Sequence, residues 1–434
     1  MRARTAIVCA VADQGVAALT NIAVLVVAAR QSSVSGFAVF SVVYTVFTVL
    51  LGLSTAYVGQ ALVLEKGEGT GEERTVGAAC VSAVGFGALA SAAAGVPAAA
   101  ALWAVGGDTP RALAVLGLVL PVVLTQDVAR YAFSALRLPQ HALGSDLVRL
   151  AAALPALAVQ PAGSGAARLI AVWGLSALPA LALSLGLLAR RTRGAGRPDV
   201  RRYLRRGHLG QRFAVEFGVG NAGTQLAVIG LGLLASPLAV GALRGAATLY
   251  GPMNVLFNAA TGFGPPLLNR AGSPARSARA AFTAGTVLAG AAGCWTVALT
   301  LLPGAWGREL LGDTWDNASR LLPATGSQYA AMALGTCGLL TLRVLRPRTT
   351  LPIQLVFSLL SVGSMLAGYA LGGVLGAAWG LCAGSAAKGA AAWIRAVRVV
   401  RTGPQLSAAA PHAPACLLYT SDAADGPSSV DVVA

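Results

Sequence analysis

The residues of this chain that could do chemistry are charged side chains inside long apolar stretches. Asp13 lies about two helical turns into the first stretch, and Glu216 lies at the matching place in the seventh. Because burying a charge in hydrocarbon is costly, an ionisable residue inside a membrane span is a candidate functional residue. One carboxylate in each half could bind a coupling cation or proton, or gate a cavity by ion pairing. The structural alternative is that each acid caps a helix or pairs with an arginine near the membrane surface.

Two further acid–arginine pairs lie in the first half of the chain. Asp127 and Arg130 are three residues apart in the fourth stretch, and Asp146 and Arg149 are three apart in the fifth. Helical residues with this spacing share one face, and a short connection makes the two helices neighbours. We therefore expect one network of four charges near the membrane surface. It could be structural, or it could contact lipid or substrate head groups.

Two cations lie inside spans of the second half. Arg244 in the eighth stretch has no acidic neighbour in sequence. Its guanidinium could therefore face a water-filled cavity, or pair with Asp13 or Glu216 on another helix. Arginine binds phosphate oxygens in a bidentate fork, which makes an anionic substrate such as a pyrophosphate one hypothesis. Lys388 in the twelfth stretch could play the same part, or could extend its amine to the interface.

Amide side chains add polar faces to the first, seventh and eighth stretches. They could line a cavity or form hydrogen bonds between helices. The candidates are Asn21, Asn221 and Gln225, with Gln14, Asn254 and Asn258 beside them.

The usual signatures of enzymes and metal sites are missing. The chain has no Walker A motif, no H-E-x-x-H, no G-x-S-x-G and no C-x-x-C, and its three histidines are scattered. We therefore expect no enzyme activity, no catalytic residues, no bound cofactor and no metal site. Coupling to H⁺, to Na⁺ or to the membrane potential is the form of energy input that remains open.

The elements that must position these residues are membrane-spanning helices. The chain has 434 residues, of which 56% are hydrophobic and 11% charged, whereas soluble domains carry about 25% charged residues. A helix needs about 20 residues to cross the hydrocarbon core. Twelve stretches satisfy that length, at 6–29, 36–64, 76–104, 111–136, 141–160, 166–189, 210–234, 237–267, 277–303, 318–342, 351–372 and 374–397. We predict an all-α membrane protein with about twelve transmembrane helices.

Basic residues predict the orientation. With the N-terminus in the cytoplasm, the inner segments carry 24 basic residues and the outer segments 5. Since positive loops stay inside, we expect a multi-pass protein of the cytoplasmic (inner) membrane with both termini cytoplasmic. The net charge of +16 is thereby explained as a topology signal with affinity for anionic membrane lipids, and no nucleic-acid partner is expected.

The chain divides into two similar halves. Sliding the first half by 203 residues places Asp13 on Glu216 and Gly15 on Gly218. Six spans in each half make the repeats parallel, so we expect two six-helix bundles around a central cavity. The predicted parts are an N-terminal bundle at 1–189, a basic cytoplasmic linker at 190–209, a C-terminal bundle at 210–401 and a disordered tail at 402–434. From about residue 415 the tail looks like translated sequencing-adapter read-through.

Three short motifs carry a family resemblance. Ala29-Arg30 with Gly36 and Phe40 is similar to an "AR-x-x-x-x-x-x-G-x-F" exit from a first span. Asp127 to Tyr131, followed by Asp146, is similar to a junction between the fourth and fifth spans. Leu311 to Ala318 is similar to a "G-x-x-W-x-x-A" start of a tenth span. In this order, over residues 5–400, they resemble the polysaccharide-flippase branch of the multidrug/oligosaccharidyl-lipid/polysaccharide (MOP) transporter superfamily.

That resemblance implies a function. It implies two bundles that alternate access to a central cavity and flip a polyprenyl-pyrophosphate-linked oligosaccharide across the membrane for cell-surface polysaccharide biosynthesis. Its partners would then be the lipid-linked saccharide, membrane lipids, and polysaccharide polymerases or glycosyltransferases. The chain departs from the pattern in having few aromatic residues and few intramembrane cations.

Two other kinds of transporter remain open. A cation-coupled multidrug efflux antiporter of the same superfamily would need Asp13 or Glu216. A major-facilitator transporter also has six plus six spans, but the segment between the second and third spans here, residues 65–74, is mostly acidic. A polymerase would need a large outer loop, which this chain lacks.

The cavity hypothesis gives a first prediction. Arg244→Ala should abolish transport while the folded protein still reaches the membrane at its normal level, because the cavity hypothesis gives this intramembrane arginine a part in transport and not only in helix packing. Transport and membrane abundance would be measured side by side. Transport at the wild-type rate would assign Arg244 to structure alone.

Overall fold

The computed structural model describes residues 3–65, 72–195, 198–220, 237–311 and 315–408, and every regular element among them is helical. The expected all-α architecture is thus confirmed. Helices suit a membrane because each satisfies its own backbone hydrogen bonds, so that no polar backbone group faces lipid.

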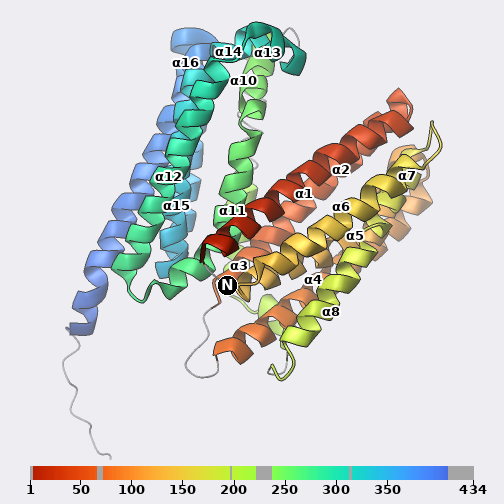
Figure 1. Ribbon diagram of the computed structural model, residues 1–434, viewed down its shortest axis with the longest axis horizontal. Helices are drawn as coiled ribbons and strands as arrows, with labels where there is room; N and C mark the ends of the chain where they lie inside the picture. Colours follow the sequence, from red (N-terminus) through yellow and green to blue (C-terminus); the bar gives the residue numbers. More distant parts are fainter. Residues whose placement is uncertain (1–2, 66–71, 196–197, 221–236, 312–314, 409–434) are drawn as a thin grey trace, which may run out of the picture.

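The first half of the chain forms one bundle, on the right in Figure 1. Its six crossing segments are α1, α2 continued by η1 and α3, then α4, α5, α6, and α7 with α8. Their bounds are α1 (Ala3–Gln31), α2 (Val34–Ser54), η1 (Thr55–Gly59), α3 (Gln60–Val63), α4 (Glu72–Val105), α5 (Asp108–Ala135), α6 (Pro139–Ala158), α7 (Ala166–Leu175) and α8 (Leu178–Arg191).

The second half forms another bundle, on the left in Figure 1. A 3₁₀ turn, η3 (Val200–Leu204), lies in the linker, and residues 209–220 are the helical start of the next span. The remaining elements are α10 (Pro237–Leu249), α11 (Gly251–Leu268), η4 (Asn269–Ala271), α12 (Pro274–Thr300), α13 (Gly304–Leu311), α14 (Trp315–Ser319), α15 (Leu322–Leu345), η6 (Pro347–Thr349) and α16 (Thr350–Ala408).

Some expected continuous spans are interrupted, and proline accounts for two of the breaks. The sixth span turns at Ser176–Ala177 just before Pro179, and the eighth turns at Tyr250 just before Pro252. Proline lacks an N–H donor and disfavours helical geometry in the residue before it. The second span instead passes through a π-helical turn, η1, in which the Gln60 N–H reaches the Thr55 carbonyl.

The last two spans were expected to separate near residue 373, and they do. The helical run of α16 changes direction at Gly372 and Gly373, where Gly373 has a φ of 59°. Glycine adopts this left-handed conformation at low cost. The second arm continues to Ala408, into the segment expected to be disordered, and residues 409–434 lie outside the described part.

Seven described helical runs are long and apolar enough to cross a membrane. One of them, Pro347–Thr402, contains both arms of α16. The bundles expose large apolar side chains along their lengths, including Leu89, Leu118, Val287 and Leu359. Such a surface suits lipid rather than water.

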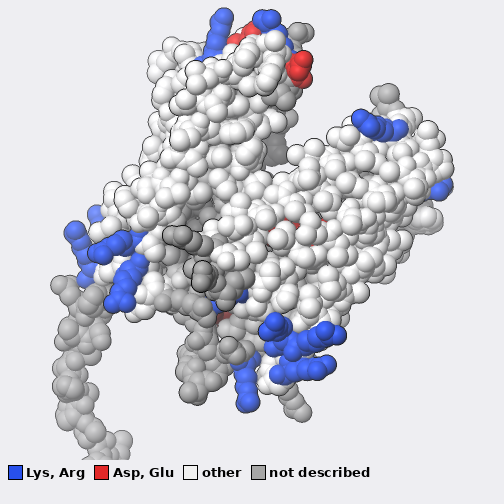
Figure 2. Space-filling model, in the orientation of Figure 1, with Lys and Arg blue, Asp and Glu red and all other residues white. Residues whose placement is uncertain are grey.

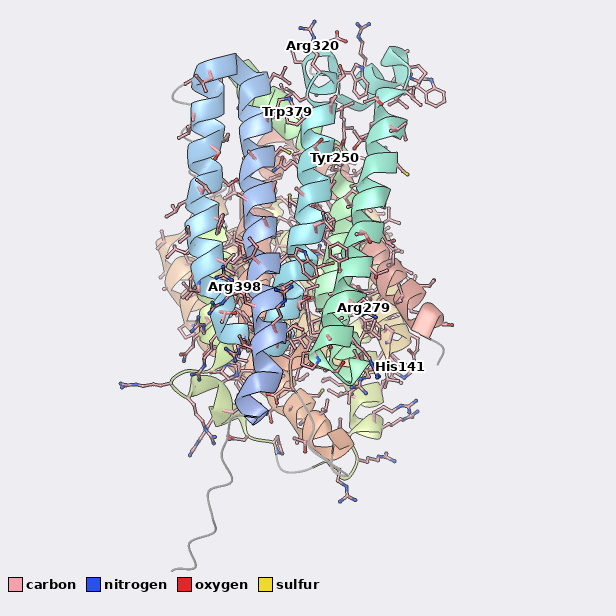
Figure 3. The ribbon with its side chains drawn as sticks, turned by 90° about the vertical axis from the view of Figure 1, so that its left-hand side faces the viewer. His141, Tyr250, Arg279, Arg320, Trp379 and Arg398 are labelled. Carbon is pink, nitrogen blue, oxygen red and sulfur yellow. The ribbon has the colours of Figure 1, made fainter. Side chains whose placement is uncertain are left out.

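The two bundles meet at one end and diverge toward the other, which gives the V shape of Figure 1. Figure 3 places Arg279 and Arg398 toward the lower end and Arg320 at the opposite end. Figure 2 shows most of the visible basic side chains at that lower end, which we call the basic end, and a notch between the bundles on the opposite side.

Small apolar contacts join the bundles near the basic end. Ala10 of α1 packs against Phe263 of α11, and Ala56 and Ala61 pack against Phe213 of the second bundle. Since the shared core is small, the bundles have separate apolar interiors that could move relative to each other.

Within the first bundle, α4 and α5 approach closely at two glycines. A Cβ atom added to Gly117 would lie 2.5 Å from the Gly95 carbonyl oxygen, and one added to Gly95 would lie 2.3 Å from the Gly117 carbonyl oxygen. Small residues of this kind allow transmembrane helices to pack backbone to backbone. The close contact fixes α5, which carries the candidate site.

This contact predicts a cost for the smallest possible enlargement. Gly117→Ala should destabilise the protein by about 1–3 kcal/mol, the usual range for overpacking, as measured by thermal unfolding in detergent. Gly186→Ala on α8 is the control, because a Cβ there meets nothing within 4 Å. Equal stability of the two variants would contradict the rigid contact.

Candidate functional site

Arg130 lies at the centre of a buried group of three aspartates, which we call the aspartate cluster. Its guanidinium is 2.8 Å from Asp13 Oδ2, 3.1 Å from Asp127 Oδ1 and 3.0 Å from Asp146 Oδ2. The Arg130 side chain is 13% exposed and those of the three acids 5–7%. One arginine therefore holds α1, α5 and α6 together inside the first bundle.

Local helix geometry explains why these groups meet. Asp127 and Arg130 share a face of α5 because they are three residues apart. The short turn after α5, where Arg137 has a φ of 62°, brings α6 back alongside. Asp146 then faces Arg130, and α1 packs on α6.

A polar shell surrounds the cluster. Gln126 donates to Asp146 Oδ1 at 3.0 Å and accepts from Arg149 at 2.6 Å, so Arg149 joins the network through an amide. Thr55 donates to Asp127 Oδ2 at 3.1 Å. The four charges of the two same-helix pairs therefore lie in one network. This network also includes Asp13, Gln126 and Thr55, and Asp146 forms its ion pair with Arg130 on another helix.

Among the side chains that the structure describes, the cluster is short of one positive charge. Three carboxylates face two guanidiniums there, those of Arg130 and Arg149, which leaves one net negative charge when all five groups are ionised. Asp13 Oδ2 accepts from both Arg130 and Gln14, whereas Oδ1 is buried and accepts no hydrogen bond from the described residues. Such an unsatisfied buried acceptor is costly. A proton or a monovalent cation at Oδ1 would satisfy both the charge and the oxygen.

The second bundle contains a related pair. Arg343 of α15 lies 3.0 Å from Glu216 Oε2, and Thr350 donates to the other oxygen of Glu216 at 2.5 Å. The Arg343 guanidinium also stacks over Phe213 at 5.1 Å. Lys388 of α16 lies close enough to interact electrostatically with both charges. When all three groups are ionised, these described side chains together carry one net positive charge.

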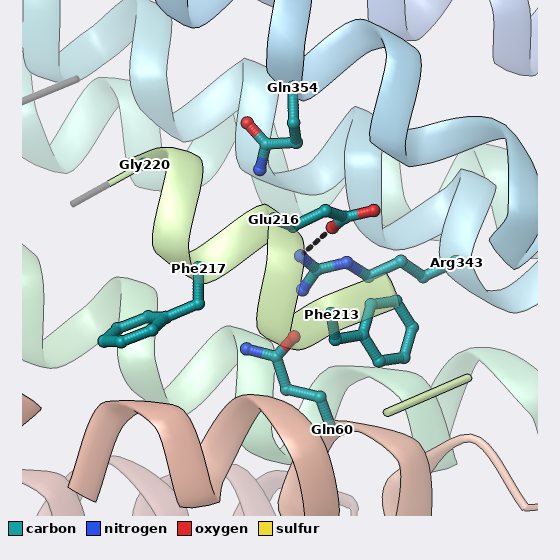
Figure 4. A pocket seen from close by; sticks show the side chains of 7 residues that line it. All are labelled: Gln60, Phe213, Glu216, Phe217, Gly220, Arg343 and Gln354. Atoms are coloured by element: carbon teal, nitrogen blue, oxygen red, sulfur yellow. Dashed lines mark hydrogen bonds and ion pairs between the residues drawn. The ribbon is translucent and has the colours of Figure 1, made fainter. Parts of the chain in front are cut away.

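A pocket of about 300 Å³ opens beside this pair, where the bundles meet. Figure 4 shows its lining, which comes from both bundles: Gln60, Phe213, Glu216, Phe217, Gly220, Arg343 and Gln354. Gln60 of α3 belongs to the first bundle, so the pocket would change shape if the bundles moved apart.

The two carboxylate–arginine pairs are related by the internal repeat. Asp13 on the first span pairs with Arg130 on the fourth, and Glu216 on the seventh pairs with Arg343 on the tenth. Sliding the sequence found both acids. Arg343 lies just beyond the predicted tenth span, 318–342, so it was assigned to a loop and was not identified as a site residue. The signal for it was its place at the end of the tenth span, which corresponds to the fourth span, α5, in the first half.

The other candidates have different outcomes. Asn21 lies on α1 with an exposed side chain that accepts a hydrogen bond from Tyr44 at 2.9 Å. Arg244 lies on α10, but its side chain is outside the described part, as are Asn221 and Gln225 entirely. The two acids suggested as partners of Arg244, Asp13 and Glu216, form ion pairs with Arg130 and Arg343 among the described side chains.

The linker packs on the basic end of the first bundle. Arg202 forms an ion pair with Glu65, and Tyr57 donates to the Tyr203 carbonyl. Burial raises the pKa of Glu65, against the opposing effect of Arg202. Burial and then Arg202 lower the pKa of His208, so this histidine is neutral at neutral pH. The linker is thus a seated segment rather than a free loop.

Comparison with known proteins identifies the architecture. No protein-family model matches the chain, and no curated protein matches it. Among solved structures, a MATE transporter in the straight conformation is similar with a TM-score of 0.72 and 10% identity, over 92% of this chain and 95% of that one. A MATE transporter of Vibrio cholerae is similar with a TM-score of 0.71 and 12% identity, over 92% and 96%.

A third similar structure is an outward-facing multidrug resistance MATE family transporter of the MOP superfamily. Its TM-score is 0.70 with 13% identity, over 92% of this chain and 95% of that one. This chain has the MATE transporter fold. The expected twelve-helix, two-bundle architecture is thereby confirmed, and the structural neighbours are transporters rather than enzymes. The MOP superfamily is named for the third of these similar structures, and for this chain both the superfamily and its polysaccharide branch stay predictions.

The aspartate cluster predicts a strong dependence on Arg130. Arg130→Gln should destabilise the protein by about 3–5 kcal/mol, the range for removing one partner of a buried ion pair, because three carboxylates lose their shared cation. Thermal unfolding in detergent would measure it. Arg168→Gln is the matched control, since Arg168 is exposed and donates only to Gln160 among the described residues; similar losses in both variants would contradict the central place of Arg130.

Proposed function

We propose that this chain is a cation-coupled exporter whose two bundles alternate access to the space between them. The observation that carries this proposal is the aspartate cluster, which has one net negative charge and a buried Asp13 Oδ1 that accepts no hydrogen bond, as far as the described residues go. A buried charge of this kind in a transporter fold is a natural site for H⁺ or Na⁺.

The position of Asp13 supports a mechanical role. It lies on α1 one turn from Ala10, which packs against Phe263 of the second bundle. A proton or cation at Asp13 would weaken its attraction to Arg130 and release α1 from α5. Because α1 bridges the bundles, the charge of the cluster would bias how they pack at the basic end.

The orientation of the molecule follows from its arginines. With the basic end in the cytoplasm, as positive loops favour, both termini are cytoplasmic and the notch between the bundles faces outward. For export across the cytoplasmic membrane, the bundles would first open at the basic end, which is closed here, and the substrate would enter there. The bundles would then exchange access, and the substrate would leave from the notch.

Amphipathic molecules are the first substrate class. Similar structures include a multidrug resistance transporter, and the visible surface of the bundles between their two ends carries few charged side chains (Figure 2). Such walls can accept varied apolar molecules, because hydrophobic contact is non-directional.

A lipid-linked oligosaccharide is the second substrate class. It is favoured by the three sequence motifs, one of which supplies Asp127, Arg130 and Asp146 of the cluster, and by the surplus positive charge of the Glu216, Arg343 and Lys388 group beside a pocket. A diphosphate would suit such charge. In this case polysaccharide polymerases and glycosyltransferases would be the functional partners.

The cluster gives a direct test in proteoliposomes. Asp13→Asn should reduce uptake driven by a proton or sodium gradient by about tenfold or more, since a charge-assisted contact contributes about 1.5–3 kcal/mol. Uptake of a fluorescent amphipathic cation and of a polyprenyl-pyrophosphate oligosaccharide would be measured in parallel. Asp316→Asn is the control, because Asp316 is exposed and pairs with Arg308 on the opposite end. Gradient-driven uptake at the normal rate in Asp13→Asn would refute the coupling role.

A further inference from the structure

The π-helical turn η1 contacts the aspartate cluster, the linker and the second bundle. It interrupts the second span at Thr55–Gly59, with Ala56, Val58 and Gly59 buried. Single π-turns inside α-helices are rare and are frequent at functional sites. Here its side chains point to three different neighbours.

The first neighbour is the aspartate cluster. The Thr55 hydroxyl donates to Asp127 Oδ2 at 3.1 Å, while the other oxygen of Asp127 accepts from Arg130. Gly59 lies against the Tyr131 ring, where an added Cβ would come within 2.8 Å of a ring carbon. The turn is therefore held against α5 on both sides of the cluster's central residues.

The second neighbour is the linker. The Tyr57 hydroxyl donates to the Tyr203 carbonyl at 2.5 Å, and its ring stacks with Phe86 at 5.8 Å. The Tyr57 carbonyl oxygen faces Gly210 so closely that an added Cβ would lie 2.0 Å away. Gly210 lies in the helical segment 209–220, so the turn limits where the first helix of the second bundle can begin.

The third neighbour is that helix itself. Ala56 packs with Phe213, and Gln60, which follows the turn, lines the pocket beside Glu216. Gly52, one turn earlier on α2, lies against the ring of Phe217. One short segment thus contacts the cluster, the linker and the second bundle.

We infer that η1 transmits the charge state of the aspartate cluster to the contact between the bundles, with Thr55 as the positioning residue. This inference rests on the proposed function. The charged carboxylate of Asp127 accepts a hydrogen bond from the Thr55 hydroxyl, and this bond holds the turn in its π-helical form. When the cluster binds a proton or cation, that acceptor weakens and the turn can relax.

A π-turn contains one residue more than the α-helical turn it replaces. Converting it to α geometry would rotate the following residues by about 100° relative to the preceding ones, because an α-helix has 3.6 residues per turn. Such a rotation would move Gln60 from the pocket and Ala61 from Phe213. A small change at Asp127 would thereby become a change at the bundle interface.

The charged groups that face Asp127 determine which protonation or cation-binding events can weaken its hydrogen bond with Thr55. They are Arg130 on the same helix, Asp13 on α1, and Asp146 and Arg149 on α6, while η1 contributes the uncharged Thr55 and α5 contributes Tyr131. Any pH response is thus that of the whole cluster, and Thr55 is the only one of these groups that lies on η1.

The test measures the distance between the bundles as pH and sodium are varied. Spin labels at Val159→Cys and Leu371→Cys, two strongly exposed positions on different bundles, are introduced after the native cysteines are replaced. Thr55→Val removes the donor and keeps the shape, and Thr55→Ser restores the donor. Thr48→Val is the matched control, because the Thr48 hydroxyl donates only to the carbonyl of Thr45 on its own helix among the described residues.

We expect the wild type, Thr55→Ser and Thr48→Val to change their interbundle distance with pH or sodium, and Thr55→Val to lose most of that change. A wild-type-like response of Thr55→Val, or an equal loss in Thr48→Val, would overturn the role of η1. A wild type that responds to neither H⁺ nor Na⁺ would instead refute the proposed function on which the inference rests.

Discussion

The structure depends on one buried arginine that forms ion pairs with carboxylates from three helices. Arg130 cannot leave Asp13, Asp127 or Asp146 without exposing an unpaired charge to a low-dielectric interior, so α1, α5 and α6 keep a fixed register. A buried ion pair of this kind adds little net stability relative to an apolar core, because desolvation offsets the attraction. Its value is positional, since each helix has only one depth at which the charges meet.

The two halves repeat this arrangement with opposite charge. The first bundle places three acids around Arg130 and Arg149 and is short of one positive charge, whereas Glu216 in the second bundle faces Arg343 with Lys388 nearby. Internal repeats in transporters place substrate and ion sites near the bilayer midplane, at the interface between the repeats. Among the described side chains, the group in the first bundle has surplus negative charge and the group in the second has surplus positive charge.

Small side chains make movement between the bundles physically reasonable. Ala10, Ala56 and Ala61 face Phe263 and Phe213 across the junction, whereas each bundle has its own larger apolar interior. A narrow junction loses little apolar contact when it opens. The linker, seated by Tyr203 and by the Arg202–Glu65 pair, keeps the second bundle attached to one place on the first.

The amino-acid sequence by itself determined that the chain lies in a membrane, that it is helical and that it forms two bundles. Hydropathy and span length are local properties of the sequence, and they decide whether a segment is long and apolar enough to cross a bilayer. The sequence also identified Asp13, Glu216 and the i, i+3 pairs as site candidates, since charge inside an apolar span is visible in the chain. Partner choice was decided only by tertiary structure: Asp146 pairs with Arg130 rather than through its own helix, and Glu216 pairs with Arg343. Such pairs depend on helix rotation and depth, which sequence spacing does not fix, and the same holds for the π-turn that brings Thr55 to Asp127.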